Sequence, residues 1–153
     1  YFEGIQMKRI DVTEMIIEAK LKKGLKWADI AQAVGHSKEW TTAAMLGQMA
    51  LTQDEAKKVG ALLDLPETAV SLLQLAPYKG ALPTQVPTDP LIYRFYELIM
   101  VYGTSIKELI HEEFGDGIMS AIDFSMDIQR EPDPKGDRVK IVLNGKFLPY
   151  KVY

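Results

Sequence analysis

The sequence is 153 residues long and predicts an α+β protein with two unlike halves. Residues 12–75 show helical spacing of apolar side chains, broken by Gly, Pro and capping residues. Residues 77–90 contain four prolines and few large apolar side chains, which is typical of an extended linker. From residue 118 onward apolar and polar side chains alternate, as in half-buried strands. We therefore predict a helical bundle over residues 7–76, a linker over 77–90, and a domain of helix and small antiparallel sheet over 91–153.

Five short helices are expected in the first half. Their expected ranges are Met15–Leu21, Trp27–Val34, Ser37–Leu46, Asp54–Leu63 and a fifth that begins at Pro66. Gly24 and Gly35 stand where helices should stop, because glycine favours the left-handed conformation that ends a helix. Ser37 can cap the third helix, and Thr52 with Glu55 has the spacing of a capping box for the fourth.

The second and third expected helices, joined at Gly35, have the spacing of a helix-turn-helix, so the first half resembles a repressor-type bundle. The would-be recognition helix carries one cation, Lys38, and Glu39 follows it directly. Residues 1–80 contain ten basic and ten acidic side chains, which leaves no net positive charge to attract phosphate. We therefore predict a bundle used for packing and no nucleic-acid partner. A transcription regulator with a dimerising second domain is the alternative from another class.

The second half is expected to begin with a helix at Pro90, which Asp89 can cap and which Gly103 would end. Ser105 and Glu108 have capping-box spacing, which predicts a separate helix after that stop. Alternating segments at Ile118–Ile128 and Val139–Leu143 then predict strands, and Asn144-Gly145 is typical of a type I′ hairpin turn leading to Phe147.

Residues 91–102 have the composition of a buried helix. Ten of the side chains are apolar or aromatic, and only Arg94 and Glu97 are charged. A helix that is apolar all round must be covered, and the rest of the second half is too small to cover it. We therefore predict a homo-oligomer in which other copies of the chain do so.

Arg94 and Glu97 are three residues apart and share one face of this helix. A buried ion pair loses much of its hydration, and this cost often cancels the attraction between the charges. Stability alone therefore does not explain the pair, and we predict that it serves the function. A structural role, in which the pair only fixes the register between subunits, is the alternative.

Ser120 is a second candidate. In a strand over Ile118–Ile128 it would be the one polar side chain of the apolar face, and its hydroxyl would need a hydrogen-bond partner. If residues 118–121 form a turn instead, the hydroxyl would bond to nearby backbone and the alternation would not apply there.

Composition excludes several kinds of site and partner. The chain has no cysteine, which excludes a thiol nucleophile and a thiolate zinc site. Its histidines, His36 and His111, lie in separate halves without the spacing of a zinc helix, so no metal is expected. No segment has the length of a membrane span or the pattern of a secretory signal, so we expect a cytoplasmic protein with no membrane partner. Residues 1–6, ahead of Met7, are expected to be a leftover segment outside the fold.

Five motifs follow one another in the second half. They are Pro87-Thr88-Asp89-Pro90, Tyr93-Arg94-Phe95-Tyr96-Glu97, Val101-Tyr102-Gly103-Thr104, His111-Glu112 and Phe114-Gly115-Asp116-Gly117-Ile118. Together they closely resemble the cyanase family, also called cyanate hydratase or cyanate lyase. The likeness extends over almost the whole chain, from about Ile10 to Tyr153.

The resemblance implies that cyanate and bicarbonate react to give ammonia and carbon dioxide, through a dianionic adduct and carbamate, without metal or organic cofactor. The family's catalytic Arg, Glu and Ser fall on Arg94, Glu97 and Ser120, and we expect the backbone N–H of Ala121 to join Ser120 in binding substrate. The resemblance also implies a homodecamer of five intertwined dimers with active sites between subunits. The second domain would then serve both dimerisation and catalysis.

Overall fold

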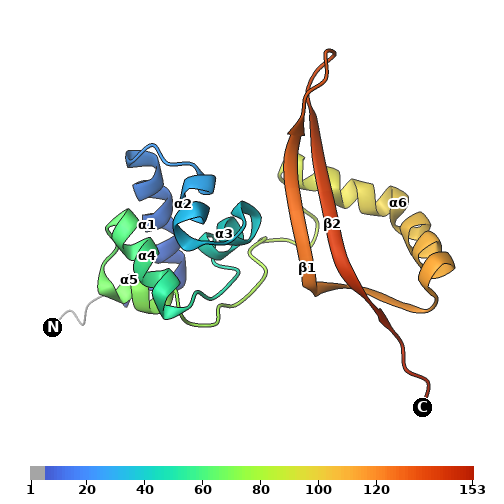
Figure 1. The fold of residues 1–153 in the computed structure, drawn as a ribbon, viewed down its shortest axis with the longest axis horizontal. Helices are drawn as coiled ribbons and strands as arrows, with labels where there is room; N and C mark the ends of the chain where they lie inside the picture. Colours follow the sequence, from blue (N-terminus) through green and yellow to red (C-terminus); the bar gives the residue numbers. More distant parts are fainter. Residues whose placement is uncertain (1–5) are drawn as a thin grey trace. The chain divides into compact units, whose positions relative to one another are not determined.

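The structure is a computed structural model that describes residues 6–153 of the chain. Residues 1–5, most of the predicted leading segment, lie outside the described residues. The chain divides into two compact units between Ala81 and Leu82. Helices α1 to α5 belong to the first unit, and α6, β1 and β2 belong to the second (Figure 1). The α+β prediction is confirmed.

The first unit is an all-helical bundle, as predicted. Its helices are α1 (Arg9–Lys22), α2 (Trp27–Val34), α3 (Lys38–Met45), α4 (Gln53–Leu63) and α5 (Glu67–Leu72). Ser37 caps α3, because its Oγ accepts a hydrogen bond from the Trp40 N–H at 3.1 Å. Gly35 ends α2 with a φ of 90°. Pro66 is the N-cap of α5 and stands just ahead of its first turn.

The bundle closes its own hydrophobic core. Every helix contributes buried side chains to one cluster, which contains Val12, Ile16, Ile30, Val34, Ala44, Met45, Leu51, Ala56, Val59, Leu63, Ala69 and Leu73. The guanidinium of Arg9 donates to the carbonyl oxygens of Ala44 at 2.7 Å and Met45 at 3.2 Å, which satisfies the C-terminal end of α3. Burial lowers the pKa of Arg9. The unit thus has a hydrophobic core that is complete within one chain.

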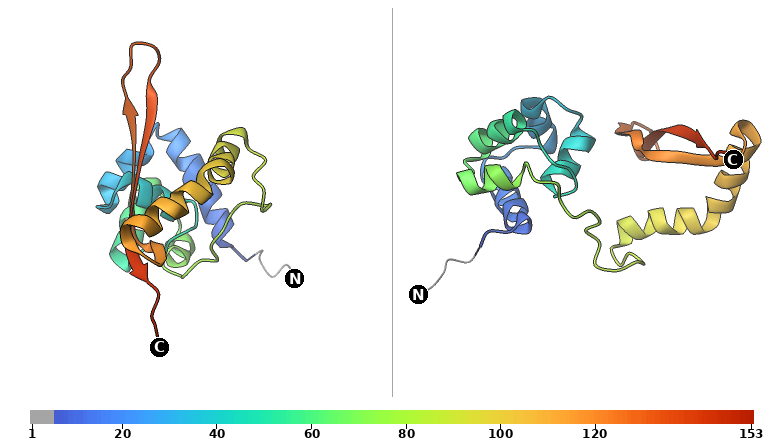
Figure 2. Two further views of the ribbon diagram at one scale, coloured as in Figure 1. Left: turned by 90° about the vertical axis from the view of Figure 1, so that its right-hand side faces the viewer. Right: turned by 90° about the horizontal axis from the view of Figure 1, so that it is seen from below.

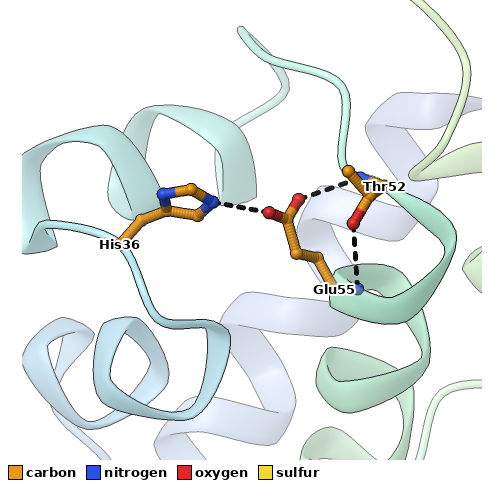
Figure 3. A network of polar contacts seen from close by, with 3 residues as sticks. All are labelled: His36, Thr52 and Glu55. Atoms are coloured by element: carbon orange, nitrogen blue, oxygen red, sulfur yellow. Dashed lines mark hydrogen bonds and ion pairs between the residues drawn. The ribbon is translucent and has the colours of Figure 1, made fainter.

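The N-terminus of α4 is tied to the turn between α2 and α3. Thr52 and Glu55 form the predicted capping box: the Thr52 N–H donates to Glu55 Oε2 at 2.9 Å, and the Glu55 N–H donates to Thr52 Oγ1 at 3.3 Å. The other Glu55 oxygen contacts His36 Nε2 at 2.5 Å (Figure 3). The backbone hydrogen bond from Thr52 and then the bond to His36 lower the pKa of Glu55.

The second unit begins with one long helix, α6 (Pro90–Phe114). Asp89 caps it, as predicted, because its Oδ1 accepts hydrogen bonds from the N–H groups of Leu91 and Ile92, each at 3.0 Å. The proline at the first helical position has no N–H to leave unsatisfied there.

The predicted stop at Gly103 is wrong, and so is the separate helix predicted from Ser105 and Glu108. Helix α6 runs through all three residues without interruption over its 25 residues. A glycine keeps its backbone N–H, so it weakens a helix interior by about 1 kcal/mol without breaking it. The helical signals on both sides of Gly103 therefore merge into one element.

Strands β1 (Gly117–Glu131) and β2 (Arg138–Pro149) form a two-stranded antiparallel sheet, which is a long, narrow hairpin in Figure 2. The turn lies in residues 132–137, where Gly136 has a φ of 127°. The small antiparallel sheet is confirmed, and within residues 6–153 it consists of these two strands.

The hairpin turn predicted at Asn144-Gly145 is wrong. Both residues lie inside β2, where they pair with Ser125 and Phe124 of β1. Gly145 is not among the described glycines with positive φ, so no turn conformation explains it. Gly145 instead stands where the main chain of β1 comes very close to β2.

The second unit buries very little within one chain. Of residues 82–153, only Gly117 and Ser120 are buried, and α6 has no buried residue. Large apolar side chains along α6 are exposed: Leu91, Ile92, Phe95, Leu98, Ile99, Met100, Val101, Tyr102, Ile106, Leu109 and Phe114. A surface this apolar is typical of one that is covered in an assembly.

Candidate functional site

Arg94 and Glu97 lie in the first turns of α6 and face each other. Arg94 Nη1 is 3.6 Å from Glu97 Oε2, which confirms that the two side chains share one face of the helix. The guanidinium carbon of Arg94 lies 5.6 Å from the centre of the Tyr93 ring, within range of a cation–π contact. The ring and the carboxylate together restrict where the guanidinium can lie.

The apolar burial predicted around this pair does not exist within one chain. The Arg94 and Glu97 side chains are 60% and 51% exposed. An exposed ion pair stabilises a protein by about 0–1 kcal/mol at most, so stability within one chain does not explain it. Apolar side chains near the pair on α6, such as Leu91, Phe95 and Leu98, are exposed as well.

Ser120 lies in an irregular stretch of β1. The ladder pairs Met119 with Phe147 and then Phe124 with Gly145, so the four residues 120–123 stand opposite a single residue of β2. Ser120 Oγ accepts hydrogen bonds from the backbone N–H groups of Ile122 at 3.0 Å and Asp123 at 2.9 Å. We call residues 120–123 the β1 bulge.

The turn considered over residues 118–121 does not form, because these residues belong to β1 and Met119 still pairs with Phe147; Ser120 is a strand residue at an irregularity of the ladder. Its hydroxyl bonds to backbone two and three residues ahead, a local pattern common for serine. The expected alternation fails at the β1 bulge, because Ile122, a residue of the expected apolar face, is 98% exposed. Ser120 itself is 6% exposed, which agrees with its predicted burial.

One chain does not bring the two halves of the candidate site together. Among residues 6–153, no hydrogen bond or ion pair joins Arg94 or Glu97 to Ser120 or Ala121. Arg94 and Glu97 lie near the start of α6, whereas the hairpin meets the last turns of that helix (Figure 2). The structure of one chain therefore shows two separate sets of candidate residues, one on α6 and one on β1.

The end of α6 packs beside the β1 bulge. The rings of Phe114 and Phe147 stack with centres 5.1 Å apart. A shallow groove of about 260 Å³ lies here, lined by Ile110, Phe114, Met119, Val142, Leu143, Asn144, Gly145 and Phe147. Apolar packing thus anchors the strands on both sides of Ser120.

No metal-ligand cluster is found in the part of the chain that the structure describes. The two histidines have other contacts: His36 pairs with Glu55, and His111 Nε2 lies 3.4 Å from Lys107 Nζ. No helix within residues 6–153 is long and apolar enough to cross a membrane.

The fold and these residues define a class of protein: a helix-turn-helix-like bundle joined to a helix that carries an Arg–Glu pair and to a hairpin that carries a buried serine. Comparison with known proteins identifies the class. Residues 9–77 match the family "Cyanate hydratase, N-terminal", and residues 84–152 match "Cyanate lyase C-terminal domain". The chain belongs to the cyanate lyase family.

Curated relatives match over their entire length. The cyanate hydratases of Thiobacillus denitrificans and Dechloromonas aromatica are 72% and 69% identical over 147 residues, which is 96% of this chain and 100% of each relative. Among solved structures, that of cyanase from T. urticae is similar with a TM-score of 0.80 and 39% identity, covering 90% of this chain and 96% of that one.

Gly145 is a residue of this region that the sequence pattern did not identify as part of the site. It stands opposite the β1 bulge, and Asn144-Gly145 has the composition of a turn. No spacing in the sequence indicated that Gly145 lies against Ser120.

Proposed function

We propose that the chain catalyses the decomposition of cyanate, with bicarbonate as co-substrate, to ammonia and carbon dioxide. The family match over both units supports the substrate, since the curated relatives are named for cyanate. The geometric observation that carries the proposal is a fork-shaped cation, Arg94, held by Glu97 on an exposed apolar helix. Such a cation suits small planar anions.

The reaction balances without an oxidant or reductant. A bicarbonate oxygen attacks the cyanate carbon, a new C–O bond forms, and the adduct is a dianion. The bicarbonate proton and one further proton reach the nitrogen, the bond between the bicarbonate carbon and the bridging oxygen breaks, and carbon dioxide leaves carbamate behind. Carbamate takes up a further proton and separates into ammonia and a second carbon dioxide without help from the protein.

Arg94 is proposed to bind the anions and stabilise the dianion. Cyanate has three heavy atoms, and the ceiling of about 1.5 kcal/mol per atom leaves little binding energy from shape alone. A guanidinium can donate two parallel hydrogen bonds to carboxylate-like oxygens, and its attraction strengthens where water is excluded. Glu97 is proposed to orient Arg94 through their 3.6 Å contact and to assist proton delivery to nitrogen.

Ser120 and the backbone N–H of Ala121 are proposed to donate hydrogen bonds to the substrate carboxylate. The Ser120 hydroxyl accepts from two backbone N–H groups, so its remaining capacity is to donate its proton. Ala121 lies in the β1 bulge, between the paired residues Met119 and Phe124. Both donors would act on charge that grows as the adduct forms.

The assembly is proposed to be a decamer of five dimers with active sites between subunits. The exposed apolar surface of α6 supports a close association between copies. The separation of the Arg94–Glu97 pair from Ser120 supports sites made of residues from different copies. Light scattering on the purified protein tests the number of subunits.

We also propose that catalysis needs no metal or organic cofactor. The chemistry asks only for charge stabilisation and proton transfer, which Arg94, Ser120 and Glu97 can supply. Dialysis against a chelator tests this proposal: unchanged turnover supports it, and loss of activity that an added metal restores contradicts it.

The deciding experiment measures ammonia release with cyanate and bicarbonate together and with each omitted. Ammonia should form only when both are present. Release that does not depend on bicarbonate would contradict the proposed adduct. A mobility-shift titration with genomic DNA fragments, run in parallel, separates this function from a transcription regulator, which would shift DNA and release no ammonia.

Two further measurements test the roles of the anion-binding residues. Oxalate resembles the dianionic adduct in size and charge, so it should compete with bicarbonate in steady-state kinetics, and a lack of competition would count against the dianion. Neutralising the pair with Arg94→Gln and Glu97→Gln should abolish turnover. Retained activity would favour the alternative in which the pair only fixes subunit register.

A further inference from the structure

We propose that Gly145 is a positioning residue for Ser120: because it lacks a side chain, the β1 bulge can lie against β2 in the conformation that makes the Ser120 hydroxyl a dedicated hydrogen-bond donor. The inference rests on the proposed function, in which Ser120 contacts the anionic substrate. It adds a residue of β2 that touches no substrate and acts through Ser120.

The register of the sheet places Gly145 beside the β1 bulge, because it pairs with Phe124, the first paired residue after the bulge. Four residues of β1, 120–123, lie between the pairs Met119–Phe147 and Phe124–Gly145, and only Lys146 lies between those pairs on β2. The longer β1 path must leave the plane of the ladder and fold back over the neighbouring strand. It folds back beside Gly145.

The space beside Gly145 does not admit a side chain. A Cβ added there would overlap the carbonyl oxygen of Ser120 and would lie 2.7 Å from Met119 Cγ. The backbone conformation of Gly145 does not itself require glycine, since its φ is not positive. The requirement is therefore a close approach, and the atom approached is the main chain of the proposed substrate-binding residue.

The β1 bulge decides what the Ser120 hydroxyl can do. A hydroxyl has two acceptor lone pairs and one donor proton. The N–H groups of Ile122 and Asp123, at 3.0 and 2.9 Å, occupy both lone pairs. Within residues 6–153, no acceptor for the proton is found, so the hydroxyl is set to donate to an acceptor outside the chain.

This arrangement also limits the chemistry of Ser120. An oxygen whose lone pairs both accept hydrogen bonds is a poor nucleophile and a poor base. Its remaining function is to donate to an ionised oxygen, which matches the anionic carboxylate of the bound substrate. A shift of about 1 Å in such a donor can lower the rate by about 100-fold, so the fit at Gly145 bears directly on catalysis.

The test compares wild type, Gly145→Ala, Ser120→Ala and the double variant in the ammonia-release assay, with native mass measured for each. Gly145→Ala should lower kcat/KM by about 100-fold while the native mass is unchanged. The double variant should match Ser120→Ala within about twofold, because an effect that acts through the hydroxyl vanishes when the hydroxyl is absent.

Gly117→Ala is the matched control. A Cβ at Gly117 would overlap the carbonyl oxygen of Leu148 and would also meet Phe147 and Pro149, so the crowding is similar and lies in the same sheet, away from the Ser120 carbonyl. Any loss caused by Gly117→Ala should be of the same size in the wild-type and Ser120→Ala backgrounds. The contrast separates displacement of Ser120 from general damage to the hairpin.

Oxalate inhibition provides a readout that a merely structural role would not move. Gly145→Ala and Ser120→Ala should weaken competitive inhibition by oxalate by similar factors, because both remove the same donor. If Gly145 only supported folding, fewer intact sites would lower kcat and leave the inhibition constant unchanged.

Three results would overturn the inference: near-normal activity of Gly145→Ala, an equal loss from Gly145→Ala in the Ser120→Ala background, or an unchanged oxalate inhibition constant. If Gly145→Ala does not assemble, Ile122→Pro takes its place, since proline removes one of the two N–H groups that hold Ser120 Oγ. Full activity of that variant would then overturn the inference. Full activity of Ser120→Ala would instead overturn the role proposed for Ser120 itself.

Discussion

The two units of the chain differ in how much of their apolar surface one chain buries. The bundle buries a cluster drawn from all five of its helices, with side chains such as Ile16 and Ile30 completely inaccessible. The second unit has a comparable supply of large apolar side chains, yet α6 buries none of them within one chain. The first unit therefore has a hydrophobic core within one chain, whereas the second unit leaves its apolar helix exposed, which is the observation behind the proposed assembly.

The proposed catalytic residues all lie in the unit that stays open. Arg94 and Glu97 are more than half exposed, and no contact within the chain joins them to Ser120. In the proposed assembly, other copies of the chain would complete the site, remove water from the charges and bring them together. We call the helical bundle the closed unit and residues 82–153 the open unit, and the following predictions test the contrast between them.

The largest effect is expected from a charge placed on α6. Leu109, which is 65% exposed, should be covered in the assembly, so Leu109→Asp should break the oligomer and reduce ammonia release to background. Leu21 of the bundle is 81% exposed, and Leu21→Asp should leave both mass and activity unchanged. Light scattering and the ammonia assay check both variants. Normal mass and activity of Leu109→Asp would remove the contrast between the two units.

Arg94→Lys should lower kcat/KM for cyanate by about 100–1,000-fold while the oligomer stays intact. Lysine keeps the charge but cannot donate two parallel hydrogen bonds from one planar group. Arg130→Lys is the matched control, because Arg130 is also an exposed arginine of the second unit, paired with Asp137 at 3.0 Å. Its kinetics should be normal. Near-normal turnover by Arg94→Lys would refute the role given to the guanidinium.

A cavity in the closed unit should affect stability rather than chemistry. Ile16→Ala should lower the free energy of unfolding of the bundle by about 2–5 kcal/mol, because the side chain is fully buried. Both tryptophans, Trp27 and Trp40, lie in the bundle, so their fluorescence during urea unfolding follows this unit. Activity per folded enzyme should be retained at low urea. A loss of activity without a loss of stability would show that the bundle takes part in catalysis.

Local signals explain why the bundle was well predicted from sequence. Ser37, Thr52 and Gly35 act through neighbours within three or four residues, and the structure places each where its spacing predicted. The hydrophobic stripes face a core inside the same unit, so helical periodicity is sufficient to place them.

The second unit departs from its sequence-based predictions for two reasons: at Gly103 the helical signals on both sides merge into one helix, and at Gly145 the deciding contact is distant in sequence. Gly103 and Asn144-Gly145 carry strong local stop and turn signals, yet α6 and β2 continue through them. At Gly145 the deciding contact is with Ser120, 25 positions away in the chain, and no local pattern contains it. The Arg94–Glu97 pairing is local and predictable, whereas the β1 bulge that holds Ser120 is an irregularity inside a strand, which neither a regular strand nor a turn over residues 118–121 describes.

The smallest expected effect concerns pH and again contrasts the two units. The pKa of Glu55 is lowered in the folded bundle, first by the Thr52 N–H and then by His36, so its carboxylate stabilises the folded state above the ordinary pKa of about 4.3. That contribution should disappear as the pH falls through the lower folded-state pKa. Glu55→Gln keeps a capping side chain but loses the charge at the start of α4, so the bundle should lose about 0.3–1 kcal/mol near neutral pH.

Urea unfolding followed by tryptophan fluorescence, from about pH 6 down to about pH 3, measures the difference between wild type and Glu55→Gln. The two curves should converge at the acidic end, because protonated Glu55 and glutamine are both neutral. Glu18→Gln, which removes one partner of an exposed ion pair with Lys22 at 3.1 Å, should change stability by less than about 0.5 kcal/mol throughout. A constant offset for Glu55→Gln at every pH would mean that side-chain shape, and not charge, secures the junction between His36 and α4.

Since Glu55 lies in the closed unit, the native mass of the oligomer should not follow this titration, and a parallel loss of mass would show that the bundle also contributes to the assembly.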